Sequence, residues 1–246
     1  MPHGPRRSAQ PTTPTGLAHR LYPKALLLAA CAFAAGGMTG TNCAGTVPSP
    51  TGQDFATNDH NLAIRRPVII STDHVMGDAN APLTVVEWED FQAPLCGRFA
   101  RFEFPTIKAQ YIDTGRVRWV VRHFPASTND RAKPAAHAAE CANDQGAFFT
   151  YRDLIYATTD ATLRTILDDT TLKQHAGTVG LDQTQFDACF AGDSKDALIT
   201  QDVNSGTTLG VQAAPAFFVG SELVSTVVTA AELIPIIDRH LRDAEQ

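Results

Sequence analysis

One cysteine of this sequence stands at a turn between a predicted strand and a predicted helix, where a pair of cysteines would perform redox chemistry. Residues 85–96 read Val-Val-Glu-Trp-Glu-Asp-Phe-Gln-Ala-Pro-Leu-Cys. In a Cys-x-x-Cys turn the first thiolate attacks a disulfide, and the second thiol resolves the mixed disulfide that forms. Ala93 occupies the first of these positions here, and Cys96 is the sulfur that remains. The sequence therefore predicts a redox turn that has lost its attacking thiol.

The elements that must position this turn are two strands and a helix. Residues 83–88 are nearly all apolar and rich in β-branched side chains, which predicts a strand buried on both faces. Residues 94–111 repeat apolar side chains at helical spacing, beginning with a proline that suits a first helical turn. Residues 117–125 predict the next strand, and this order implies two parallel strands joined by a helical crossover. A further short strand is expected at residues 67–70.

The second half of the chain predicts a block of helices followed by two strands and a last helix. The helices are expected at 134–142, 145–157, 170–179, 183–191 and 194–209. Two short strands follow at 216–219 and 222–227, and an amphipathic helix spans about 230–241. The predicted order is β-α-β, a helical block, then β-β-α.

This order resembles the DsbA-like branch of thioredoxin-fold proteins over roughly residues 64–243. Four runs carry the resemblance: Gly-Asp-Ala-Asn-Ala-Pro at 77–82, Arg-His-Phe-Pro at 122–125, Ala-Ala-Glu-Cys-Ala at 138–142, and Gly-Val-Gln-Ala-Ala-Pro-Ala-Phe-Phe-Val at 210–219. The resemblance implies an α/β thioredoxin fold with a helical domain inserted at about 128–209. It also implies membership of a family of thiol–disulfide oxidoreductases, which use no cofactor.

The resemblance assigns roles to three residues around the turn. Ala93 matches the attacking cysteine, whose thiolate a helix N-terminus stabilises. Cys96 matches the resolving cysteine, so dithiol turnover is not expected, and any remaining chemistry would pass through this single thiol. Glu87 matches the family's buried acid beneath the redox pair. The alternative is a structural glutamate of the strand that is hydrogen-bonded to local polar groups.

The run at 210–219 resembles the family's cis-proline loop. Pro215 would then be the cis proline facing the redox turn, although an ordinary trans loop proline fits the same letters. In the family this loop holds substrate backbone in an extended form. The resemblance thus implies a binding surface of Ala214, Pro215, Pro94 and Leu95, with extended or unfolded exported polypeptides as partners.

Cys141 and Cys189 lie on the apolar faces of two predicted helices. An exported domain folds under oxidising conditions, so we expect these two cysteines to form a structural disulfide. Two separate buried thiols are the alternative. Such a bridge leaves Cys96 without a partner in the folded domain.

The histidines give no sign of a metal site. The sequence has eight of them, with no His-x-x-x-His spacing and no second cysteine close to Cys96. Neither a metal nor a cofactor is therefore expected. His123, at the end of a predicted strand, is either a catalytic group or a side chain that packs beside Phe124.

The N-terminal part predicts export. Residues 1–43 have a basic start and an apolar run at 25–35, which is shorter than the about 20 residues that span a bilayer. A short buried helix is the alternative. Lipidation at Cys31 or Cys43 would anchor the chain, and otherwise it would be secreted or held by the uncleaved segment. Residues 44–63 read as a flexible linker before a domain at 64–246.

The distribution of charge along the chain indicates which classes of partner are expected. The net charge is −6, but residues 1–50 carry +4, which leaves −10 on the rest. An acidic domain without basic clusters does not suit nucleic acid, and membrane contact is expected only through the N-terminal segment or a lipid anchor. Three functions remain: a single-thiol oxidoreductase, a redox-inactive module that binds polypeptides, and an anchored scaffold of the cell envelope.

Overall fold

The computed structural model describes residues 66–125, 131–158, 167–225 and 229–244. The predicted export segment at 1–43 and the linker at 44–63 lie outside the described residues. Within the described ranges, no helix combines the length and the apolar character needed to cross a membrane.

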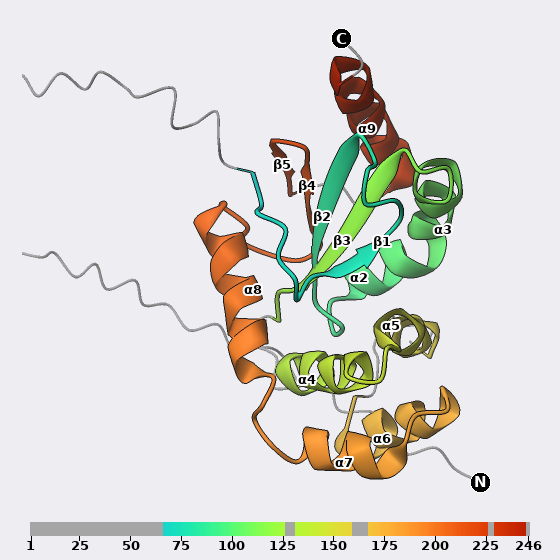
Figure 1. Ribbon diagram of the computed structural model, residues 1–246, viewed down its shortest axis with the longest axis vertical. Helices are drawn as coiled ribbons and strands as arrows, with labels where there is room; N and C mark the ends of the chain where they lie inside the picture. Colours follow the sequence, from blue (N-terminus) through green and yellow to red (C-terminus); the bar gives the residue numbers. More distant parts are fainter. Residues whose placement is uncertain (1–65, 126–130, 159–166, 226–228, 245–246) are drawn as a thin grey trace, which may run out of the picture. The chain divides into compact units, whose positions relative to one another are not determined.

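The described residues form a five-stranded sheet in the order β1-β3-β2-β4-β5 (Figure 1). Its strands are β1 His74–Met76, β2 Leu83–Glu89, β3 Val117–His123, β4 Ala216–Val219 and β5 Glu222–Val224. The central strands β2 and β3 are parallel, while β1, β4 and β5 each pair antiparallel with their neighbours. After the edge strand β1, the order of elements is the β-α-β unit, helical block and β-β-α unit that the sequence predicts.

The expected strand at residues 67–70 is wrong. These residues have no regular structure, and the edge strand β1 begins only at His74. The chain turns first, because Asp73 Oδ2 accepts a hydrogen bond from Ile70 N at 2.8 Å and Asp73 N donates to Ile70 O at 3.2 Å. The predicted strand at 222–227 is also shorter, since β5 ends at Val224.

Residues 94–112 form the predicted helix, but as a composite. It consists of α2 Pro94–Arg98, the π-helical η1 Phe99–Glu103, α3 Phe104–Ile107 and the π-helical η2 Lys108–Ile112. Pro105 has no N–H to donate, and its ring crowds the carbonyl four residues earlier. A wide π turn ahead of this proline is consistent with both constraints.

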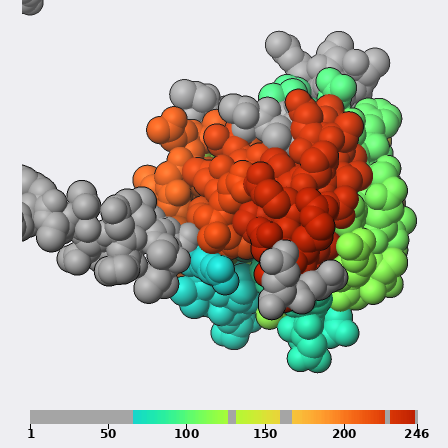
Figure 2. Space-filling model, turned by 90° about the horizontal axis from the view of Figure 1, so that it is seen from above, coloured from blue at the N-terminus to red at the C-terminus, as the bar shows by residue number. Residues whose placement is uncertain are grey.

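The two faces of the sheet are covered by different helices. Side chains of the composite helix and of α9 Ala230–Ala244 pack with Val85, Trp119 and Phe217 on one face. Figure 2 views the molecule from the end at which α9 lies, and the red surface of α9 lies near the middle of that view. On the other face α8 Asp196–Thr208 approaches Trp88 closely, because a Cβ at Gly206 would lie 2.8 Å from the indole Nε1.

The predicted helical insert follows β3. Its helices are α4 Ala132–Asn143, α5 Phe148–Ala157, α6 Asp169–Thr178, α7 Gln183–Phe190 and α8. Asp168 and Asp182 cap α6 and α7, since their carboxylates accept hydrogen bonds from Thr171 N and Gln185 N. These caps explain why the helix boundaries could be predicted to within a few residues.

Candidate functional site

The predicted redox turn joins the end of β2 to the start of α2. Gln92 N donates to Asp90 Oδ1 at 2.8 Å and Ala93 N donates to Asp90 O at 3.0 Å, which closes the turn. Ala93 is the N-cap of α2 in an extended conformation and makes no side-chain capping bond. The positive end of the helix therefore meets a methyl group, where the chemistry would require a thiolate.

Cys96 lies within the first turn of this helix and is the free cysteine among the described residues. Its residue is 1% exposed, and Sγ accepts a hydrogen bond from Asp90 N at 3.4 Å. Burial raises the pKa of the thiol well above its ordinary value, and the nearby carboxylates of Glu89 and Glu87 raise it further. A buried thiol that stays protonated is neither a nucleophile nor accessible to one.

Glu87 is buried beneath the turn and shares one guanidinium with Glu89. Glu89 Oε2 accepts from Arg152 Nε at 2.8 Å, and Glu87 Oε2 accepts from Arg152 Nη2 at 3.3 Å and from Trp119 Nε1 at 3.0 Å. Tyr156 donates its hydroxyl to Glu89 at 3.2 Å. Sequence reasoning missed Glu89, and it missed Arg152 and Tyr156 because both come from α5, more than sixty residues away along the chain.

The pKa of Glu87 is raised to about 7. Burial is the main cause, and the attraction of Arg152 does not offset it. Oε1 of this carboxyl is buried without a hydrogen-bond partner in the described part of the chain. Glu87 therefore holds a proton under mildly acidic conditions and loses it near neutral pH, at a cost to the folded state.

We expect Glu87→Gln to remove a pH dependence of stability. An ordinary glutamate pKa in the unfolded chain lies near 4.5, so the wild type loses stability as pH rises from about 4.5 through 7. The loss attributable to this residue is on the order of 3 kcal/mol. Glutamine keeps an acceptor for Trp119 and never ionises. The check is urea unfolding of both proteins at pH 4.5 and pH 8, and equal losses in the two would refute this role of Glu87.

The proline loop lies at the same edge of the sheet as the turn. The Ala214–Pro215 peptide is cis. Ala216 pairs with Trp88, so the residue before Ala216 lies beside the end of β2, where the turn begins. Pro215 is buried and Ala214 half-buried, whereas Ala213 is exposed.

The remaining residues of the turn complete this surface. Pro94 is exposed, and Leu95 is 46% exposed despite its apolar side chain. Ala93 and Ala214 both pack against the same hydrophobic core. The structure thus places the residues of the predicted binding surface at the same edge of the sheet.

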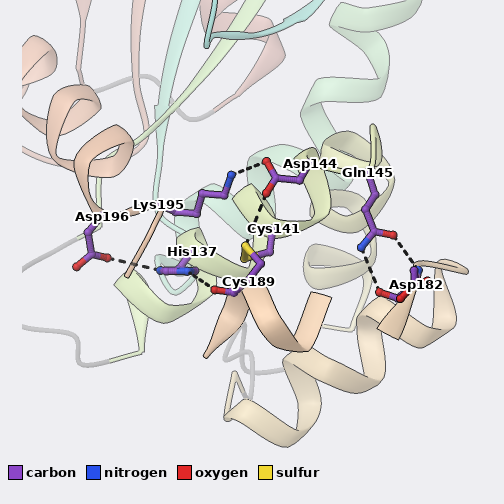
Figure 3. The surroundings of a disulfide bond; sticks show 8 residues. All are labelled: His137, Cys141, Asp144, Gln145, Asp182, Cys189, Lys195 and Asp196. Carbon is purple, nitrogen blue, oxygen red and sulfur yellow. Dashed lines mark hydrogen bonds and ion pairs between the residues drawn. A yellow bond between two sulfur atoms is a disulfide. The ribbon is translucent and has the colours of Figure 1, made fainter. Parts of the chain in front are cut away.

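Cys141 of α4 and Cys189 of α7 form a disulfide within the helical insert, with an S–S distance of 2.01 Å (Figure 3). His137 Nε2 lies 3.2 Å from the carbonyl oxygen of Cys189, and Lys195 forms an ion pair with Asp144 beside the bridge. This pair fastens two helices of the insert and is separate from Cys96.

The ring of His123 packs near those of Phe91 and Phe148, not against Phe124. His123 is 1% exposed, and its ring contacts a glutamate of α4, Glu140, at 2.9 Å. Burial keeps the imidazole from the exposed surface formed by the turn and the proline loop.

Comparisons with known proteins agree with this geometry. A family model described as Thioredoxin matches residues 70–239. The fold is similar to that of α-DsbA1 from Wolbachia pipientis (25% identity, 72% of this chain and 94% of that chain, TM-score 0.61). It is similar to a thioredoxin-like oxidoreductase from Silicibacter pomeroyi (26%, 70% and 94%, TM-score 0.61) and to BdbD from Bacillus subtilis (21%, 69% and 93%, TM-score 0.64).

Curated relatives carry another name. Na(+)/H(+) antiporter NhaA 3 from Salinispora tropica is 36% identical over 62% of this chain and 22% of its own length. NhaA 1 from Mycobacterium sp. strain KMS is 31% identical over 72% of this chain and 28% of its own length. The chain spans about a quarter of the length of the curated relatives it matches.

Proposed function

The chain belongs to the thioredoxin family and shares the fold of DsbA-type thiol–disulfide oxidoreductases, and from this premise we propose that it binds extended polypeptides without dithiol redox turnover. The observation that carries the proposal is the contrast within one turn. Cys96, the one sulfur of the turn, is 1% exposed, while the neighbouring Leu95 is 46% exposed. The surface has kept its apolar contact residues and not its thiol chemistry.

A single-thiol reaction at Cys96 is the competing function, and the burial of the thiol argues against it. Disulfide exchange needs a thiolate that a substrate sulfur can approach in line. The raised pKa of Cys96 keeps it in the thiol form, and Gly97 and Phe99, which follow it in the helix, are buried as well. Reaction would require opening of the first helical turn.

Polypeptide binding is supported by the backbone of the proline loop. Within the described part of the chain, no hydrogen bond engages the N–H or the carbonyl group of Ala214. An extended segment could pair with these groups as an added strand, in the manner of β-augmentation. Leu95 and Pro94 would then contact apolar side chains of that segment, which gives the surface a preference for unfolded chains.

We place this activity outside the cytoplasm. The Cys141–Cys189 disulfide supports this location, since such bridges persist in oxidising compartments. The basic and apolar pattern of residues 1–43 supports export by a signal peptide or a lipoprotein-type segment. Ion transport, the activity in the relatives' names, is not part of the proposal, because the match covers 22% of the first relative.

The test is binding of a reduced and alkylated, permanently unfolded polypeptide, measured by fluorescence anisotropy. We expect Leu95→Asp to weaken binding roughly tenfold, the effect of about 1.4 kcal/mol of lost apolar contact. Val68→Asp is the matched control, because Val68 is an exposed apolar residue outside this surface. Cys96→Ser should bind as the wild type does.

Two results would contradict the proposal. If Leu95→Asp and Val68→Asp bind equally well, the turn is not the contact surface. If Cys96→Ser abolishes binding of a disulfide-containing polypeptide while the protein stays folded, the single-thiol function is correct instead.

A further inference from the structure

A buried cluster of two histidines and a glutamate joins the helical insert to the sheet. His74 Nε2 lies 2.7 Å from Glu140 Oε1, and His123 Nε2 lies 2.9 Å from the same oxygen. One ligand atom of each residue lies within 4.8 Å of the other two. The three residues are 5%, 1% and 3% exposed in the order His74, His123, Glu140.

The fold brings these residues together by register. His74 pairs with Val121 across the antiparallel β1–β3 ladder, so their side chains point to the same face of the sheet. His123 follows Val121 by two residues and therefore points to that face as well. Glu140 reaches the two rings from α4. Three separate elements thus deliver one side chain each to a single point.

The donor set suits a divalent transition-metal ion, and zinc best. Zinc binds imidazole nitrogen and carboxylate oxygen at about 2.0–2.2 Å, which places neighbouring ligand atoms roughly 3 to 3.4 Å apart. The two observed contacts of 2.7 and 2.9 Å need to open by only about half an ångström to reach that spacing. The ion would take the place of the proton in each nitrogen–oxygen contact, and a water molecule could fill a fourth position.

The charge around the cluster also favours a divalent cation. Glu140 supplies one carboxylate, and Asp202 supplies a second, because its Oδ2 accepts a hydrogen bond from His123 N at 2.9 Å. The neighbouring guanidinium of Arg122 binds both oxygens of Asp73, at 2.7 and 2.9 Å. Two carboxylates, those of Glu140 and Asp202, therefore lie beside the imidazole-bearing residue His123.

Aromatic rings hold the two histidines in place. Phe148 stacks on His74 with 3.5 Å between ring centroids and 8° between ring planes. Phe91 lies 5.9 Å from the ring of His123, whose buried Nδ1 has no hydrogen-bond partner among the described residues. Packing, rather than further hydrogen bonds, thus orients this ring, and the apolar wall limits the access of bulk water.

We propose that His74, His123 and Glu140 form a zinc site that ties β1 and β3 to α4. The site is distinct from the redox turn and independent of polypeptide binding. It would serve the structure, by fixing the helical insert against the sheet at the end where the turn lies.

Cobalt and zinc binding to the full chain, stripped of metal with a chelator, test the site. We expect one equivalent of Co²⁺ to give a visible d–d spectrum without a thiolate-to-cobalt charge-transfer band, and equimolar Zn²⁺ to abolish that spectrum and raise the unfolding temperature. Glu140→Gln and His74→Gln should each weaken zinc binding by at least about tenfold in competition with a colorimetric chelator. His240→Gln is the matched control, because it removes a different histidine–carboxylate contact, that with Glu222 at 3.0 Å.

Two results would overturn the zinc site. Binding that survives Glu140→Gln and His74→Gln unchanged would overturn the site, since histidines at other positions would then be the ligands. If a variant does not fold, the wild-type spectrum decides: no d–d band at one equivalent of Co²⁺, or a band from thiolate ligands, refutes the proposal.

Discussion

Ala93→Cys is expected to turn this domain into a working dithiol oxidoreductase. The introduced thiol would stand at the N-cap of α2, where the helix dipole and unpaired N–H groups stabilise a thiolate. A pKa lowered to near 7 would raise the ionised fraction at neutral pH from a few per cent to about half. Cys96 lies three residues further on in the first turn, in the place of a resolving thiol. Burial raises the pKa of Glu87 to about 7, and this carboxyl lies near enough to Cys96 to raise the pKa of the thiol.

The readouts are the loss of two thiols on mild oxidation and turnover in an insulin-reduction assay, which the wild type should lack. Ala213→Cys is the matched control, because it adds a thiol to the same edge of the sheet without a helix N-terminus. A folded Ala93→Cys protein that forms the disulfide but stays inert would show that the substrate surface has diverged too. A protein that does not form the disulfide would contradict the geometry of the turn.

Removal of the Cys141–Cys189 bridge is expected to cost a large share of the stability of the fold. The bridge closes a loop of 48 residues between α4 and α7. In the chain-entropy account, a loop of this length stabilises the folded state by about 4 kcal/mol. We expect the double variant Cys141→Ala/Cys189→Ala to lose about 3–4 kcal/mol in urea unfolding and to melt on the order of 10 °C lower.

Two comparisons isolate the cross-link. Cys96→Ala removes a buried sulfur without opening a bridge, so it should cost less than the double variant. Reductant should destabilise the wild type to the level of the double variant and leave that variant unchanged. A double variant within about 1 kcal/mol of the wild type would mean that the helices of the insert hold together without the bridge.

Patterns along the chain predicted most elements of the fold, because each depends on its own residues. β2 and β3 follow from two apolar runs, and the helices of the insert follow from periodicity and from caps such as Asp168 and Asp182. No strand forms at 67–70, because a hydrogen bond from Ile70 N to the Asp73 carboxylate turns the chain before the sheet begins. A run of apolar residues does not reveal that a nearby side chain favours a turn over a strand.

The residues of the candidate site also differ in how far local sequence predicts them. The places of Ala93 and Cys96 at the helix N-terminus and the cis peptide before Pro215 could be predicted from local sequence and family resemblance, because a turn and a loop carry them. Arg152 could not be predicted, since its contact with Glu87 spans 65 residues. His74 and Glu140 are 66 residues apart, and motif spacing detects ligands on one helix rather than those that three elements bring together.

We expect the folded domain to offer no reactive thiol at its redox turn. Titration of the full chain with an aromatic disulfide reagent, beside Cys96→Ser and without reductant, tests it directly. Cys31 and Cys43 contribute equally to both proteins, so the difference between the two reports Cys96 alone. We predict equal numbers of reacting thiols under native conditions and one more in the wild type once denaturant is added. One additional fast-reacting thiol in the native wild type would show that Cys96 is reactive in the folded domain.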